Sequence, residues 1–105
     1  MVGGRSRARP PRQLTDDPEA WPQQPAADPA VEAVRHVARA LAGALDEQGL
    51  SLRAAAEGSG VNRQAIADLL AGLSWPDIAT VARLAAFTGA GLWPPPSGTD
   101  RSGKH

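Results

Sequence analysis

The feature that most constrains this chain is a series of short segments, each of which begins at a helix-capping residue and ends at a glycine. Side chains of Ser, Asp and Asn accept hydrogen bonds from the free N–H groups at a helix start. Glycine readily adopts the left-handed conformation found just after a helix end. The starts are Asp28, Ser51, Asn62 and either Ser74 or Asp77, and the ends are Gly49, Gly58 with Gly60, Gly72 and Gly89. This series predicts several short helices joined by tight turns.

Within the segments, apolar side chains recur every three or four residues, which is the period of an amphipathic helix. These residues are Val34, Val37, Ala38, Leu41, Ala44 and Leu45, then Leu52, Ala55 and Ala56, then Ile66, Leu69, Leu70 and Leu73, and finally Ile78, Val81, Leu84 and Ala85. The many alanines and few aromatic residues argue against a sheet. We therefore expect an all-α fold, a compact domain of four to five helices over residues 29–93, with Leu92 and Trp93 folding back on its core.

The two ends of the chain differ from this domain in composition. Most of the ten prolines lie near the start, where arginine and glutamine separate them, and three more follow Trp93. Frequent proline blocks a helix and cannot donate to a sheet. We expect residues 1–28 to form a disordered Pro/Arg-rich arm and residues 94–105 to form a disordered tail.

The composition also excludes several classes of function. The chain has no cysteine, and its two histidines lie far apart, so we expect no metal site and no cofactor. No apolar run approaches the roughly 20 residues that span a bilayer, and no apolar stretch follows the basic N-terminus, which predicts a cytoplasmic protein. No Ser/His/Asp set or pair of carboxylates gathers on one predicted face, so we do not expect an enzyme.

The stretch from Ser51 to Gly72 carries the strongest functional signal. Two helices that cross steeply through a tight turn touch near that turn, so the first helix needs a small side chain there. Ala56 supplies it, and Gly60 suits a turn with a positive φ angle. Ile66 then helps to anchor the second helix on the core. This pattern predicts a helix-turn-helix.

The helical period places five side chains on the exposed face of the second helix, namely Arg63, Gln64, Ala67, Asp68 and Ala71, and the first four lie toward its N-terminus. In a helix-turn-helix, the N-terminal part of this helix contacts base edges in the major groove. Arginine suits guanine and glutamine suits adenine, an alanine methyl can contact thymine, and a carboxylate can accept from cytosine. These residues are the candidate base-reading set.

The segment from Leu50 to Pro94 resembles the Cro/phage-repressor (XRE) family of helix-turn-helix regulators. The small residue, the turn glycine and the buried aliphatics of that family fall at Ala56, Gly60, Val61, Ile66 and Leu69, and Gly72 follows the recognition helix as in the family. The resemblance implies a transcriptional regulator of double-stranded DNA. It also implies base contacts from Arg63, Gln64 and Asp68, and phosphate contacts near Ser51 and Asn62. A homodimer, which it suggests, would place two recognition helices ~34 Å apart on a palindromic site.

A second class of function stays open beside DNA binding. The formal net charge is zero, whereas nucleic-acid binders are usually basic, and Leu52 stands where the family often has a polar, phosphate-binding residue. The fold could therefore serve as a protein-interaction module or an antitoxin-like partner protein. The arginines of the arm, Arg5, Arg7, Arg9 and Arg12, are either a minor-groove contact or a solvated tail.

Overall fold

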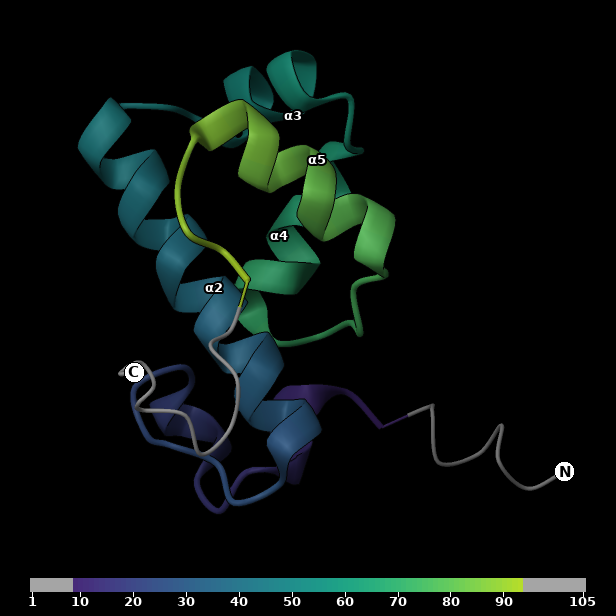
Figure 1. The fold of residues 1–105 in the computed structure, drawn as a ribbon. Helices are drawn as coiled ribbons and strands as arrows, with labels where there is room; N and C mark the ends of the chain where they lie inside the picture. Colours follow the sequence, from purple (N-terminus) through teal and green to yellow (C-terminus); the bar gives the residue numbers. More distant parts are fainter. Residues whose placement is uncertain (1–8, 94–105) are drawn as a thin grey trace, which may run out of the picture.

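The computed structural model describes residues 9–93 and is all-helical over them (Figure 1). Two short 3₁₀-helices, η1 (Pro11–Leu14) and η2 (Pro18–Ala20), precede the α-helices of this part of the chain. These α-helices are α2 (Pro29–Gln48), α3 (Leu52–Ser59), α4 (Arg63–Ala71) and α5 (Ile78–Thr88). The prediction of an all-α domain is confirmed. The predicted tail, residues 94–105, and residues 1–8 of the predicted arm lie outside the described residues.

Each α-helix begins at a side-chain cap. The Asp28 carboxylate accepts the N–H groups of Ala30 and Val31, and the Ser51 hydroxyl accepts that of Ala54. The sequence left the start of the last helix open between Ser74 and Asp77. The structure assigns it to Asp77, whose carboxylate accepts the Thr80 N–H at 2.7 Å. The first three helices thus start at the caps that the sequence predicted, Asp28, Ser51 and Asn62, and the fourth starts at one of its two candidates.

The predicted glycine ends are also present, with one correction. Gly49, Gly60, Gly72 and Gly89 follow the four helices with φ angles of 64°, 77°, 73° and 71°. Gly58 does not break α3 but lies inside it. The Phe87 ring packs where a Cβ at this position would stand. The close approach of α5 to α3, rather than a turn, accounts for glycine at this position.

The core lies where α2, α4 and α5 meet, and α3 packs on α4 and α5 (Figure 1). Its fully buried large side chains include Leu41 of α2, Ile66 and Leu69 of α4, Leu84 of α5 and Leu92. Leu92 folds back on the core as predicted, while Trp93 remains half exposed. No helix in residues 9–93 has both the length and the apolar content that a membrane crossing requires.

Two residues predicted to face inward are exposed instead. Ile78 is 75% exposed, because it is the first residue of α5 and the inward stripe of that helix runs through Val81, Leu84 and Thr88. Leu73 is 51% exposed, because the left-handed turn at Gly72 redirects the chain away from the inward face of α4. Both exceptions lie at helix ends, where the 3.6-residue period no longer determines which way a side chain faces.

The N-terminal segment, residues 9–28, differs from the expected disordered arm. Both of its 3₁₀-helices begin at a proline, where the missing N–H is no loss and the fixed φ angle suits a helical turn. Pro11 is fully buried, and Trp21 packs against the core. Pro11 and Pro18 thus start helical turns, and Pro11 is also buried, so prolines that indicated disorder have structural roles here.

Candidate nucleic-acid interface

The turn between α3 and α4 is built from the residues that the sequence indicated. Gly60 has a φ angle of 77°, and its N–H donates to the Ala56 carbonyl at 2.9 Å. Val61 follows as a buried residue of the core. Ala55 is fully buried, and Ala56, the predicted small contact residue, is partly buried against the core. Two successive alanines therefore allow α3 to lie close to α4.

Ile66 and Leu69 fix the orientation of α4, because both are fully buried. The opposite side of the helix start is open to solvent, with exposed side chains at Asn62, Arg63 and Gln64. The two remaining candidates of α4, Ala67 and Asp68, are partly buried one turn further along. The structure thus brings Asn62, Arg63, Gln64, Ala67 and Asp68 together along the first two turns of one helix.

Gln64 and Asp68 are directly bonded to each other. The Gln64 Nε2 donates to Asp68 Oδ1 at 3.0 Å, a contact that the sequence analysis did not anticipate although the two residues are four apart. An amide nitrogen carries two hydrogens, and the amide oxygen accepts. Gln64 therefore keeps one N–H donor and its carbonyl acceptor for a ligand, and Asp68 sets the direction in which they point.

The capping side chains keep donors of their own. The Asn62 Oδ1 accepts the N–H groups of Gln64 and Ala65, at 2.8 and 3.2 Å, which leaves its amide nitrogen free to donate. The Ser51 Oγ accepts the Ala54 N–H at 3.0 Å, and its hydroxyl hydrogen is likewise available. Both residues thus cap a helix and still have a donor available to a ligand.

The charges around this surface are sparse. Arg53 of α3 pairs with Glu57 at 3.5 Å, on exposed side chains. Among residues 9–93, no carboxylate lies within ion-pair distance of Arg63. The Arg63 guanidinium therefore keeps its full donor set for an outside acceptor. The same range of residues contains no group of His, Cys, Asp or Glu that could hold a metal ion.

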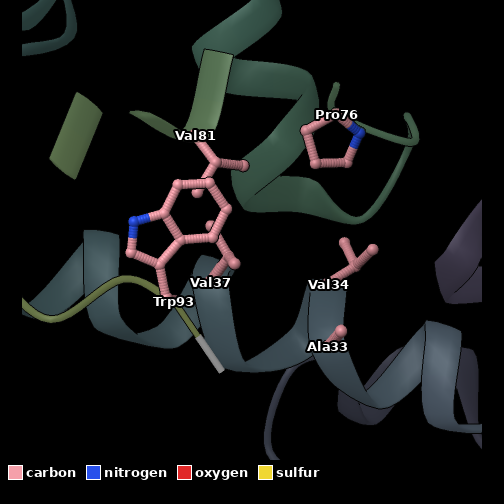
Figure 2. A pocket seen from close by; sticks show the side chains of 6 residues that line it. All are labelled: Ala33, Val34, Val37, Pro76, Val81 and Trp93. Carbon is pink, nitrogen blue, oxygen red and sulfur yellow. The ribbon is translucent and has the colours of Figure 1, made fainter. Parts of the chain in front are cut away.

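A second surface feature, which the sequence did not reveal, is an apolar groove between α2 and α5 (Figure 2). It has a volume of about 180 Å³ and is lined by Ala33, Val34, Val37, Pro76, Val81 and Trp93. The indole of Trp93 and the ring of Pro76 form its two walls above the α2 side chains (Figure 2). The only aromatic residue that lines it is Trp93, next to the tail, and the sequence contains no other signal for it.

Comparison with known proteins gives one finding. A family model described as Helix-turn-helix matches residues 38–92, which is just over half of the chain. The match includes α3, the Gly60 turn, α4 and α5, and it begins within α2. No curated protein and no solved structure matches the chain.

Proposed function

The chain belongs to the helix-turn-helix family of the Cro/phage-repressor (XRE) type, and from this premise we propose that it is a small transcriptional regulator that reads a specific sequence of double-stranded DNA. The observation that carries the proposal is the exposed start of α4, where Arg63 and Gln64 project from a helix whose other face is fixed by Ile66 and Leu69. A rigidly held helix with free polar groups at its N-terminal end suits insertion into a major groove.

The base contacts of the proposal follow from the free donors and acceptors. The Arg63 guanidinium has no ion-pair partner within residues 9–93, and it suits O6 and N7 of guanine. Gln64 retains one N–H and its carbonyl, the pair that N7 and N6 of adenine require. Ala67 lies one turn further along and suits contact with a thymine methyl. Asp68 acts through Gln64 in this arrangement, and its second oxygen is left for a cytosine amine.

The phosphate contacts of the proposal come from the two helix caps. Asn62 and Ser51 each hold a backbone N–H with an oxygen and keep a donor that points outward. A helix N-terminus also attracts an anion through its partial positive charge. These contacts would set the register of α4 on the duplex, while the α4 side chains read the sequence.

The experiment that tests the proposal is selection of bound duplexes from a random pool at ~150 mM salt. We expect a short enriched motif, and palindromy within it would support the homodimer. Arg63→Ala should weaken binding to that motif by about 1–3 kcal/mol and relax the preference at one base pair. The matched control is Arg39→Ala, which removes an exposed arginine from α2, a helix that contributes nothing to the proposed interface.

A second candidate function is a protein-interaction module with a helix-turn-helix fold. The observation that favours it is the uncharged apolar groove beside Trp93, together with a formal net charge of zero. Salt dependence separates the two functions, because counterion release makes DNA affinity fall steeply with salt. If the well-folded protein enriches no duplex at any salt concentration, the DNA-binding proposal fails and the protein-interaction function is favoured.

A further inference from the structure

The C-terminal end of α4 has carbonyl groups that the helix itself does not satisfy. The last carbonyls of any helix lack an intrahelical N–H. Here the Leu73 N–H donates to Asp68 O at 2.8 Å and the Gly72 N–H donates to Leu69 O at 3.1 Å, which completes a Schellman-type end. The carbonyls of Leu70 and Ala71, and that of Gly72 just after the helix, receive no hydrogen bond from residues 38–92, which the family model matches.

The N-terminal segment supplies donors for two of these carbonyls. The Trp21 Nε1–H donates to the Leu70 carbonyl at 3.1 Å, and the Arg12 backbone N–H donates to the Gly72 carbonyl at 2.9 Å. The indole also packs against Gly72, where an added Cβ would stand 2.5 Å from the Trp21 ring. Residues 9–28 thus cap the end of α4 by two hydrogen bonds and by direct packing.

The same segment is anchored to α2 at its other end. The residue Arg35 is 8% exposed, and its guanidinium donates to the Pro22 carbonyl at 2.9 Å and to Glu32 at 2.8 Å. Glu32 in turn accepts the Ala26 N–H at 2.8 Å. A nearly buried arginine is stable only when its donors are satisfied. α2 therefore holds the segment through a charged residue that depends on it.

A third contact joins the segment to the loop that follows α4. The Trp75 Nε1–H donates to the Arg9 carbonyl at 2.9 Å. Within the segment, the Arg12 Nε donates to the Pro18 carbonyl at 2.8 Å and keeps the two 3₁₀-helices together. The segment consequently touches α2, the end of α4 and the α4–α5 loop, all from outside the matched residues 38–92.

We propose that the N-terminal segment is a clamp that holds the C-terminal end of the recognition helix on α2, and that Trp21 and Arg12 are positioning residues for DNA binding. The clamp itself follows from contacts within the chain, and its effect on DNA rests on the proposed function. A helix fixed at its far end loses less freedom when its near end docks, so the clamp strengthens binding without contacting a base. Base preference stays with the α4 side chains.

The test compares Trp21→Phe and Trp21→Ala in the full chain with Trp93→Phe as the matched control. Trp21→Phe removes the indole N–H but keeps an aromatic ring, and Trp93→Phe makes the same change at the groove. Hydrogen exchange without DNA is measured first, at the backbone amides of residues 69–73. We expect about tenfold faster exchange in Trp21→Phe, faster exchange still in Trp21→Ala, and no change in Trp93→Phe.

Affinity for the duplex selected by the wild type is measured second, at a temperature at which circular dichroism shows every variant folded. Trp21→Phe should bind about three- to tenfold more weakly, with unchanged base preference. Unchanged exchange at residues 69–73 in both Trp21 variants would overturn the clamp. Faster exchange with unchanged affinity would overturn the positioning role. If the wild type selects no duplex, the DNA function fails and the positioning role with it, while the exchange data still decide the clamp.

Discussion

The helix-turn-helix, residues 51–72, and the N-terminal segment, residues 9–28, are of similar length, but their side-chain hydrogen bonds span different distances along the chain. Ser51 and Asn62 bond to backbone groups two or three residues away. In the segment, Trp21 bonds to a residue 49 positions away, and Arg9 accepts from one 66 positions away. The first region is shaped by its own sequence and the second by the surface that receives it. Substitutions should therefore affect the two regions differently.

The largest effect is expected from Ile66→Ala, which removes a fully buried side chain of α4. Loss of the buried methyl and methylene groups, together with the cavity left behind, should lower the free energy of unfolding by about 2–5 kcal/mol in urea titrations. The matched control is Ile78→Ala, since Ile78 is 75% exposed. That variant should change stability by less than about 0.5 kcal/mol. Equal losses in the two variants would contradict the described packing.

Gly60→Val is expected to have the next largest effect, and it tests the turn alone. A Cβ at Gly60 would meet no atom within 4 Å, so only the φ angle of 77° opposes a side chain there. A β-branched residue in this conformation should cost about 1–3 kcal/mol of unfolding free energy. Gly43 of α2 is equally open but has an ordinary helical conformation. Gly43→Val should shift the thermal midpoint much less than Gly60→Val. Similar shifts in the two variants would show that the φ angle of Gly60 is not the source of the loss.

The contrast between the two regions explains what could be predicted from the sequence. The caps at Ser51 and Asn62 and the turn at Gly60 depend on neighbours a few residues away, so residue type and spacing suffice to find them. Trp21 gives no such local signal, because its partner lies on α4. Its surroundings, rich in proline, indicated disorder by composition alone. Contacts between distant residues are what composition leaves out.

The same reasoning applies within the candidate site. The exposed positions of Arg63 and Gln64 follow from the helical period once Ile66 and Leu69 face inward. The hydrogen bond from Gln64 to Asp68 depends on rotamers, and the groove beside Trp93 depends on how α2 and α5 pack, so neither was predictable from spacing. The roles of the site residues stay predictions until DNA is bound.

Arg35→Met tests how the N-terminal segment is held on α2. The methionine keeps an apolar stem but removes the hydrogen bonds that Arg35 donates to the Pro22 carbonyl and to Glu32. We expect a loss of about 1–2 kcal/mol and faster trypsin cleavage after Arg12, because the segment detaches before the domain unfolds. Arg39→Met, at an exposed position of the same helix, should leave cleavage unchanged. Slower or unaltered cleavage in Arg35→Met would show that the segment is held by other contacts.

The smallest effect is expected from acid, through Glu32. The hydrogen bond from Arg35, more than any other cause, lowers the pKa of Glu32 below its ordinary value of 4.5. A carboxylate with a lowered pKa in the folded state stabilises the protein above its unfolded pKa, and this contribution disappears as the pH falls through the folded pKa. Since the Glu32 side chain is 38% exposed, solvent screening should keep the contribution below about 1 kcal/mol.

Urea titrations from about pH 5 to about pH 3 would measure this contribution. The wild type should lose more stability over that range than Glu32→Gln, which cannot titrate. In the Arg35→Met background the main partner is already gone, so Glu32→Gln should alter the pH dependence less than it does in the wild type. The Asp77 carboxylate, whose pKa is lowered chiefly by its bond to the Thr80 side chain, serves as the local counterpart. Asp77→Asn should change the pH dependence of stability equally in the wild type and in the Arg35→Met background. The Asp77 cap depends on α5 and not on the N-terminal segment.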